Sequence, residues 1–324
     1  MNSGHPVAQT TERPPAICLL GPTAAGKTDL AVEIVQRFPC DIISVDSAQI
    51  YREMDIGTGK PDAATLARAP HRLFDFLDPA QSYSASRFRE DALREMQLIH
   101  AAGRIPLLVG GTMLYFRALR DGLADMPASD EGVRQRILMT ADNEGWAAVH
   151  AQLAQVDPES AARIHPNDPQ RLQRALEIYL VSGETMSAFH RREERQQARD
   201  SLPFTLHFFA LQPDDRAVLH DRIARRFRGM LEQGLVTEVE RLYARGDLHL
   251  GMPSMRAVGY RQVWRHIAGE LSFDAMVEQG IIATRQLAKR QITWMRSWDN
   301  LHSFNSEDPE TQSLLLNLIE GIAI

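Results

Sequence analysis

The sequence predicts an α/β fold, in which a mainly parallel β-sheet is flanked by helices on both faces and is interrupted by an all-helical insertion. In the first 120 residues, short apolar runs alternate with segments of helical spacing. Residues 121–200 carry helical patterns without a convincing strand, and strand composition returns at residues 204–211. We therefore expect a core made of residues 16–120 and 201–324, with residues 121–200 as the inserted domain.

The elements of the first half follow from local patterns. Residues 1–15 are polar and contain prolines, which is typical of a loose tail. Apolar runs predict strands over residues 16–20, 41–45 and 105–109. Helical spacing predicts helices over 29–38 and 86–102, the second of which ends before Gly103.

Helices dominate the rest of the chain. Within the insertion, the apolar positions predict helices near residues 133–139, 146–153 and 171–180. Residues 191–200 are almost entirely polar, and we expect a variable connection there. After the returning strand, further helices are predicted over roughly 215–245, 259–268 and 274–298.

The composition describes a folded protein whose charges are unevenly distributed. The chain has 324 residues, 44% of them hydrophobic, and a net charge of 36 − 42 = −6. Residues 1–159 hold 15 bases and 21 acids, residues 160–300 hold 21 bases and 17 acids, and residues 301–324 hold no base and four acids. The acidic total therefore does not exclude a nucleic-acid partner, because the central part of the chain is basic.

Few lysines and cysteines are present. Lys27, Lys60 and Lys289 are the only lysines, and the arginine excess fits either a genomic bias or a use of the guanidinium fork for phosphate. Cys18 and Cys40 have no spacing typical of a disulfide framework or a zinc site. No apolar run reaches the length of a membrane span and no signal pattern begins the chain, so we expect a cytoplasmic protein with no membrane partner.

A phosphate-binding loop follows the first predicted strand. The segment fits the pattern G-x-x-x-x-G-K-[ST] and is formed by Gly21, Pro22, Thr23, Ala24, Ala25, Gly26, Lys27 and Thr28. Backbone N–H groups, the start of the next helix and Lys27 create a site for a diphosphate or triphosphate, and the Thr28 hydroxyl is suited to hold Mg²⁺. This loop makes the predicted core P-loop NTPase-like.

The usual carboxylate partner of such a loop is missing from the strand at 105–109, which ends in Gly110-Gly111-Thr112. Asp46 instead follows the strand at 41–45, and it should face the same crevice, because the carboxyl ends of parallel strands share one edge. There it is placed to act as a general base. The alternative is that Asp46 caps a following helix.

Motifs along most of the chain resemble the tRNA dimethylallyltransferase (tRNA isopentenyltransferase) family of bacterial type. The resemblance rests on residues 21–28, 46–51, 55–58, 70–73, 109–115, 164–168, 170–174, 256–261 and 286–294. It implies transfer of a dimethylallyl group from dimethylallyl diphosphate to N6 of adenosine 37, next to the anticodon, with Mg²⁺ as cofactor. It also explains why a phosphate loop here lacks the second carboxylate, since the loop would bind the diphosphate of the prenyl donor.

The resemblance implies roles for individual residues. Asp46 would take the N6 proton, Thr23 would donate to the bridging oxygen or the diphosphate, and Lys27, Thr28 and Arg226 would neutralise the leaving group. Helix geometry also places Arg222 and Arg225 beside Arg226, either as an edge facing phosphate or as a solvated edge.

The partner implied is the tRNA anticodon stem-loop, bound by a protein expected to act as a monomer. Four segments would contact the tRNA, and positions close to the flipped base complete the set: Asp46, Ser47, Ala48, Gln49, Thr112, Arg134, Gln170, Arg171, Leu172, Gln173, Arg174, Arg256, Ala257, Val258, Gly259, Tyr260, Arg261, Lys289, Arg290, Gln291, Ile292, Thr293, Trp294, Met295 and Arg296. On the helix predicted at 274–298, Arg285, Lys289 and Arg296 share one side, which also fits an ordinary amphipathic helix.

Three other functions remain open from the residues alone. A nucleoside or nucleotide kinase also pairs a phosphate loop with an aspartate base, but it requires ATP turnover. A related adenylate isopentenyltransferase would prenylate free AMP, ADP or ATP without the basic surfaces at 256–261 and 289–296. The third is an RNA-binding module without catalysis, in which the phosphate loop and Asp46 would have no function.

Overall fold

The computed structural model describes residues 13–123, 126–197 and 202–323. Most of the predicted tail and residues 198–200 of the predicted connection lie outside these ranges. The described residues divide into two compact units, those within Met1–Arg120 and Pro203–Ile324 and those within Asp121–Leu202. No helix among the described residues is both long and apolar enough to span a lipid bilayer.

The first unit is built on a six-stranded parallel sheet with the order β3-β2-β4-β1-β5-β6. This result confirms the predicted α/β class with a parallel sheet. The strands are β1 (Pro15–Leu20), β2 (Cys40–Val45), β3 (His71–Arg72), β4 (Ile105–Gly110), β5 (Thr205–Gln212) and β6 (Leu301–Asn305).

Alternate side chains of the central strands enter opposite layers of the core. Ile17 and Leu19 of β1 pack in one cluster with α1 (Lys27–Arg37) and α14 (Thr311–Ala323). On β5, Phe208 contacts Trp298 with ring centroids 5.1 Å apart, and Trp298 also contacts Phe116 of α4 (Met113–Asp121). The central strands are therefore buried on both faces, which is why their sequences are almost continuously apolar.

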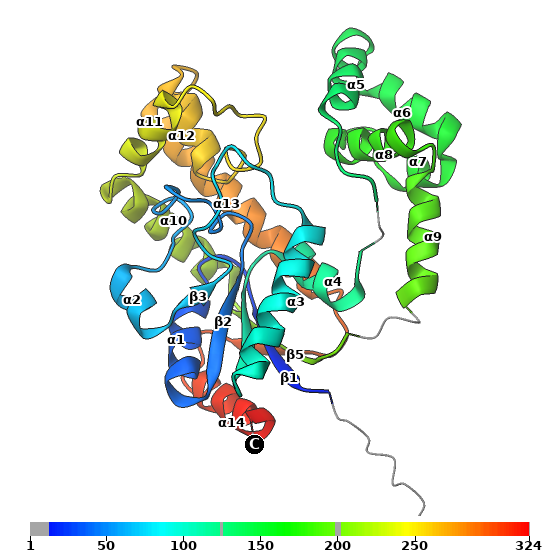
Figure 1. The fold of residues 1–324 in the computed structure, drawn as a ribbon. Coiled ribbons are helices and arrows are strands. Elements are labelled where there is room, and N and C mark those ends of the chain that lie inside the picture. Colours follow the sequence, from blue (N-terminus) through cyan, green and yellow to red (C-terminus); the bar gives the residue numbers. More distant parts are fainter. Residues whose placement is uncertain (1–12, 124–125, 198–201, 324) are drawn as a thin grey trace, which may run out of the picture. The chain divides into compact units, whose positions relative to one another are not determined.

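The remaining helices of this unit include a group that packs together, α10 (Arg216–Glu232), α11 (Leu235–Ala244), α12 (Tyr260–Ile267) and α13 (Phe273–Met295) (Figure 1). Two others are α2 (Ala63–Arg68) and α3 (Ala85–Ala101), and α3 contacts β2 and β4. The single helix predicted over 215–245 is wrong: Gly234 has φ +102°, a left-handed conformation that separates α10 from α11.

The carboxyl-terminal segment contains two elements that the sequence did not predict. β6 extends the sheet beside β5, and α14 buries Leu315, Leu316 and Ile319 against the core. β6 is short, and its polar residues His302, Ser303 and Asn305 do not alternate with apolar ones, so its pattern does not stand out from a loop.

The second unit contains helices and no strand among its described residues. These helices are α5 (Glu131–Glu144), α6 (Trp146–Val156), α7 (Pro158–Arg163), α8 (Pro169–Ser182) and α9 (Met186–Gln197). Val149, Leu153, Leu172 and Ala175 lie in its core. The polar connection predicted at 191–200 is wrong for residues 191–197, which belong to α9.

Candidate active site

A cavity of about 820 Å³ lies in the first unit, at the carboxyl ends of β1, β2 and β4. The phosphate loop, the turn after β2 and the loop after β4 line it from the sheet side. Side chains of α10 and α13 and the segment 253–259 line it from the other side. The expectation that Asp46 and the phosphate loop face one crevice is therefore confirmed.

The phosphate loop turns directly into α1, whose first residue is Lys27. The Lys27 ammonium donates to the carbonyl oxygens of Gly21 at 2.9 Å and Pro22 at 2.7 Å. Burial lowers the pKa of Lys27 to about 8, while Asp46 raises it and Arg226 lowers it further. The loop thus combines the positive end of a helix with a partly desolvated amine, an arrangement suited to an anion.

Arg226 enters the cavity from α10, and its guanidinium lies against the backbone of Gly59. A Cβ atom on Gly59 would lie 1.8 Å from Arg226 Nη2, so only glycine leaves room for the guanidinium. Burial lowers the pKa of Arg226 and Asp46 raises it. Arg222 and Arg225 do not join it, because Arg222 bonds to Ser306 and Arg225 pairs with Asp221. The alternative in which the three arginines form one edge facing a phosphate is therefore wrong, and of the three only Arg226 lines the cavity.

Asp46 is held by the turn that follows β2. Its Oδ1 atom accepts from the backbone N–H groups of Ala48 at 2.8 Å and Gln49 at 3.2 Å. The alternative that Asp46 caps a helix is wrong, because residues 47–50 form turns and α2 begins only at Ala63. The two bonds fix the carboxylate at the cavity wall through one oxygen, as in an Asx turn.

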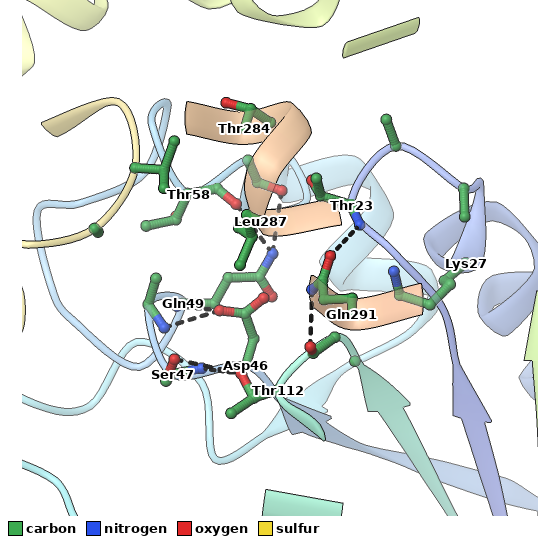
Figure 2. A pocket seen from close by; sticks show the side chains of 18 of the residues that line it. Thr23, Lys27, Asp46, Ser47, Gln49, Thr58, Thr112, Thr284, Leu287 and Gln291 are labelled. Carbon is green, nitrogen blue, oxygen red and sulfur yellow. Dashed lines mark hydrogen bonds between the residues drawn. The ribbon is translucent and has the colours of Figure 1, made fainter. Parts of the chain in front are cut away.

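The turn after β2 is connected to the loop after β4. Thr112 accepts a hydrogen bond from Ser47 N through its hydroxyl oxygen at 3.0 Å, and Gln49 donates from Nε2 to the carbonyls of Thr58 and Gly59 (Figure 2). These contacts place Asp46 between two loops that come from different parts of the chain.

Glu238 of α11 supports the segment beside Arg226, a role that no sequence motif indicated. Its buried carboxylate accepts from the backbone N–H groups of Asp55 at 3.0 Å, Ile56 at 2.7 Å and Gly57 at 3.1 Å, and from the Tyr260 hydroxyl. Three convergent N–H groups around one carboxylate hold the segment that backs the guanidinium.

Gln291 of α13 connects the phosphate loop to the loop after β4, and this role was also not predicted. Figure 2 shows its amide between these two loops, where it accepts from Thr23 N at 3.0 Å and donates to Gly111 O at 2.8 Å. The only signal in the sequence was membership of a motif that the family resemblance assigned to tRNA contact.

In the first unit, the surface and cavity-lining residues that were expected to contact tRNA lie in three places. The main cavity is lined by Asp46, Ser47, Ala48, Gln49, Thr112, Arg256, Ala257, Val258, Gly259, Arg290, Gln291 and Trp294. Lys289, Ile292, Thr293 and Arg296 line a second cavity, of about 390 Å³, which also has Arg216 and Arg285 in its wall. Arg261 is exposed on α12. Arg285, Lys289 and Arg296 therefore lie together, as the helical spacing predicted, whereas Arg290 lines the main cavity.

The second unit carries the other candidates. Gln170 and Arg171 are exposed on α8, and Gln173 is half-buried. Arg134 and Arg174 both bind Glu177, which is fully buried: Arg134 Nε lies 3.0 Å and Arg174 Nη1 lies 2.9 Å from its carboxylate oxygens. Asp130 N also donates to Glu177, so one buried carboxylate orients both arginines.

The side chains of Leu172, Tyr260 and Met295 lie in the hydrophobic core. They are apolar or bonded internally, and they hold their segments in place instead of presenting a surface. This corrects the expectation that every residue of these segments is available to tRNA.

The described residues contain no cluster of three or more His, Cys, Asp or Glu side chains that could hold a metal ion. Thr28 lines the cavity at the exposed start of α1. A metal here would therefore be held by this hydroxyl together with the oxygens of a bound anion, which is the way Mg²⁺ is often bound beside phosphates.

Comparisons with known proteins agree over most of the chain. A family model described as IPP transferase matches residues 49–298, and a model described as isopentenyl transferase matches residues 15–76. The chain is 34% identical to a full-length tRNA isopentenylpyrophosphate transferase from Bacillus halodurans, covering 95% of this chain and 96% of that one, with a TM-score of 0.70.

Two further solved structures are similar. A tRNA delta(2)-isopentenylpyrophosphate transferase from Staphylococcus epidermidis is 34% identical, with coverage of 95% and 98% and a TM-score of 0.67. A eukaryotic dimethylallyltransferase acting on tRNA shares the fold, with 24% identity, coverage of 94% of this chain and 78% of that one, and a TM-score of 0.76.

Proposed function

Because this chain belongs to the IPP transferase family, whose similar solved members are tRNA isopentenylpyrophosphate transferases, we propose that it transfers a dimethylallyl group from dimethylallyl diphosphate to N6 of adenosine 37 in tRNA. The observation that carries the proposal is the cavity in which a phosphate loop and Asp46 face each other. The loop suits a diphosphate leaving group and the carboxylate suits an amine nucleophile, so one cavity contains both halves of the reaction.

The first half is departure of the diphosphate. Breaking the C1–O bond of the allylic donor leaves the bonding electrons on oxygen, while positive charge develops on the allyl group. The loop N–H groups, Lys27 and Arg226 stabilise that negative charge more strongly as it grows. Thr23 contributes a hydroxyl toward the bridging oxygen or the diphosphate.

The second half is attack by the N6 amine on C1. The N6 lone pair is delocalised into the adenine ring, so the amine is a weak nucleophile until it begins to lose a proton. Asp46 takes that proton as the C–N bond forms, and the products are N6-dimethylallyladenosine and diphosphate. The hydrogen bonds to Ala48 N and Gln49 N keep the carboxylate at the wall of the cavity while it does so.

We assign Mg²⁺ to the diphosphate, where Thr28 supplies the one protein ligand expected. When bound, the ion neutralises part of the diphosphate charge. The residues of the loop and Arg226 bind and orient the same group from the protein side.

The tRNA surface follows from the basic residues on both units. The adenine must leave its stack to reach the cavity, since a base stacked between its neighbours cannot enter a pocket in the protein. On the first unit we assign backbone contacts to the basic side of α13 and a contact near the base to Thr112; on the second unit, taken by itself, we assign tRNA contacts to the exposed residues of α8. We propose a monomeric, cytoplasmic enzyme, in keeping with its tRNA substrate.

The proposal is tested by incubating the protein with dimethylallyl diphosphate, Mg²⁺ and unmodified tRNA, followed by mass analysis of the nucleosides. We expect one adenosine per modified tRNA to gain a dimethylallyl group in place of a hydrogen atom. In parallel incubations, prenylation of added AMP with untouched tRNA would identify an adenylate isopentenyltransferase instead, and phosphorylation of a nucleoside or nucleotide by added ATP would identify a kinase.

Asp46→Asn is the matched variant for this assay, because the amide is nearly isosteric and its oxygen can still accept from Ala48 N and Gln49 N. We expect transfer to be lost while tRNA affinity stays within about tenfold, since a general base acts in the chemical step. Full activity in this variant would contradict the role assigned to Asp46.

A further inference from the structure

The Gln291 side chain is buried on the inner side of α13, and both ends of its amide are bonded. The residue is 9% exposed. Its Oε1 atom accepts from Thr23 N at 3.0 Å, and its Nε2 atom donates to Gly111 O at 2.8 Å. A backbone N–H can only donate and a carbonyl can only accept, so the partners determine which way the amide faces. Neither a carboxylate nor an apolar side chain satisfies both.

The two partners belong to the two halves of the site. Thr23 is part of the phosphate loop, which faces the leaving group. Gly111 precedes Thr112, whose hydroxyl accepts from Ser47 N, directly after Asp46. The contact is close, since a Cβ atom on Gly111 would lie 2.4 Å from Gln291 Nε2. Gln291 therefore connects the diphosphate side of the cavity to the side that carries the base.

We propose that Gln291 is a positioning residue, which sets the distance between the phosphate loop and the loop after β4 and thereby aligns C1 of the donor with N6 and Asp46. This inference rests on the proposed function. It gives Gln291 a task different from the tRNA contact that the family resemblance implied, because both polar atoms of its side chain are already bonded within the protein.

A positioning residue should affect the chemical step more than substrate affinity. Transfer between two bound substrates depends on the reacting atoms being held in line, and a displacement of about 1 Å can lower the rate about a hundredfold. We assign tRNA backbone binding to exposed basic residues, whereas both polar atoms of the Gln291 side chain are bonded within the protein. The turnover rate and the tRNA affinity should therefore separate in variants of this residue.

The test compares Gln291→Met and Gln291→Glu with Gln279→Met. Methionine is similar in size to glutamine but makes neither bond, whereas glutamate can accept from Thr23 N but places a carboxylate oxygen against Gly111 O. Gln279 lies on the same helix, and its amide accepts from Arg265 at 3.3 Å, away from the cavity. It reports what the loss of a glutamine contact does to α13 in general.

We expect the single-turnover transfer rate, at saturating tRNA and donor, to fall about tenfold to a hundredfold in both Gln291 variants. The Kd for tRNA should stay within about twofold, and Gln279→Met should match the wild type in both measurements. If Gln291→Met does not fold, as judged by its thermal transition, Gln291→Glu carries the test.

Either an unchanged single-turnover rate or weakened tRNA binding that accounts for the whole loss of activity would overturn the inference. An equal loss in Gln279→Met would also overturn it, because the effect would then belong to the helix. Absence of transfer by the wild-type protein would instead contradict the proposed function itself.

Discussion

The pKa of Lys27 leads to a pH dependence that tests the diphosphate site. Burial lowers this pKa to about 8, so Lys27 loses its positive charge as the pH rises through that value. Only the charged form attracts the diphosphate of the donor. Affinity of the free enzyme for dimethylallyl diphosphate should therefore be present below pH 8 and decline above it.

The size of the effect follows from the titration. With a pKa of about 8, roughly 90% of Lys27 is charged at pH 7 and roughly 9% at pH 9. We expect kcat/KM for dimethylallyl diphosphate to fall about tenfold between these two values. The decline of kcat with rising pH should be weaker than that of kcat/KM, because a bound diphosphate lies beside the ammonium and favours its charged form.

The assay is initial-rate transfer to saturating tRNA from pH 7 to pH 9.5, at constant ionic strength. Lys27→Arg provides the comparison, since a guanidinium stays charged throughout this range. Its activity at pH 7 is expected to be lower, because a guanidinium does not fit the place of an ammonium, but its profile should lack the limb near pH 8. A flat profile in the wild type, or the same limb in Lys27→Arg, would refute the reasoning.

Three further predictions concern residues that support the site. Gly59→Ala should lower kcat/KM for the donor at least tenfold, because the new Cβ would displace the Arg226 guanidinium. The control is Gly103→Ala, at a residue with a similar φ but open space around it, which should leave the kinetics unchanged at a comparable cost of about 1 kcal/mol in stability. Equal kinetics in the two variants would exclude the steric argument. Arg285→Glu combined with Lys289→Glu should weaken tRNA binding and reduce the slope of log binding constant against log salt concentration by about two, with Arg241→Glu on α11 as the control. Identical slopes would show that this side of α13 does not contact tRNA. Glu177→Gln should lower the free energy of unfolding by about 1–3 kcal/mol in chemical denaturation, since Arg134 and Arg174 lose a buried charged partner. The control Glu184→Gln, which loses an exposed ion pair with Arg192, should cost less than about 1 kcal/mol. Similar losses in the two variants would show that burial of Glu177 adds nothing to the stability.

The central strands and the phosphate loop were predictable because their signals are local. Strands buried on both faces are continuous apolar runs, and the loop requires glycines, a lysine and a hydroxyl at fixed spacing. The position of Asp46 in the same cavity could also be predicted without its contacts, because the carboxyl ends of parallel strands share one edge of the sheet. β6 and the break at Gly234 were missed because the former has a weak pattern and the latter lies inside a stretch that is otherwise helical.

The sequence by itself determined the fold class, the phosphate loop, its aspartate partner and the family, because each depends on residue types at short, fixed spacings. Only the tertiary structure decided what Gln291, Glu238 and Glu177 do. Gln291 bonds to a residue 268 positions away, and Glu238 to a segment about 180 positions away. Such contacts form when distant elements pack together, and no local pattern marks a polar side chain that will be buried against the backbone of a remote loop. Packing also decided that Arg226, and not Arg222 or Arg225, enters the cavity, because Arg222 and Arg225 bond to partners elsewhere.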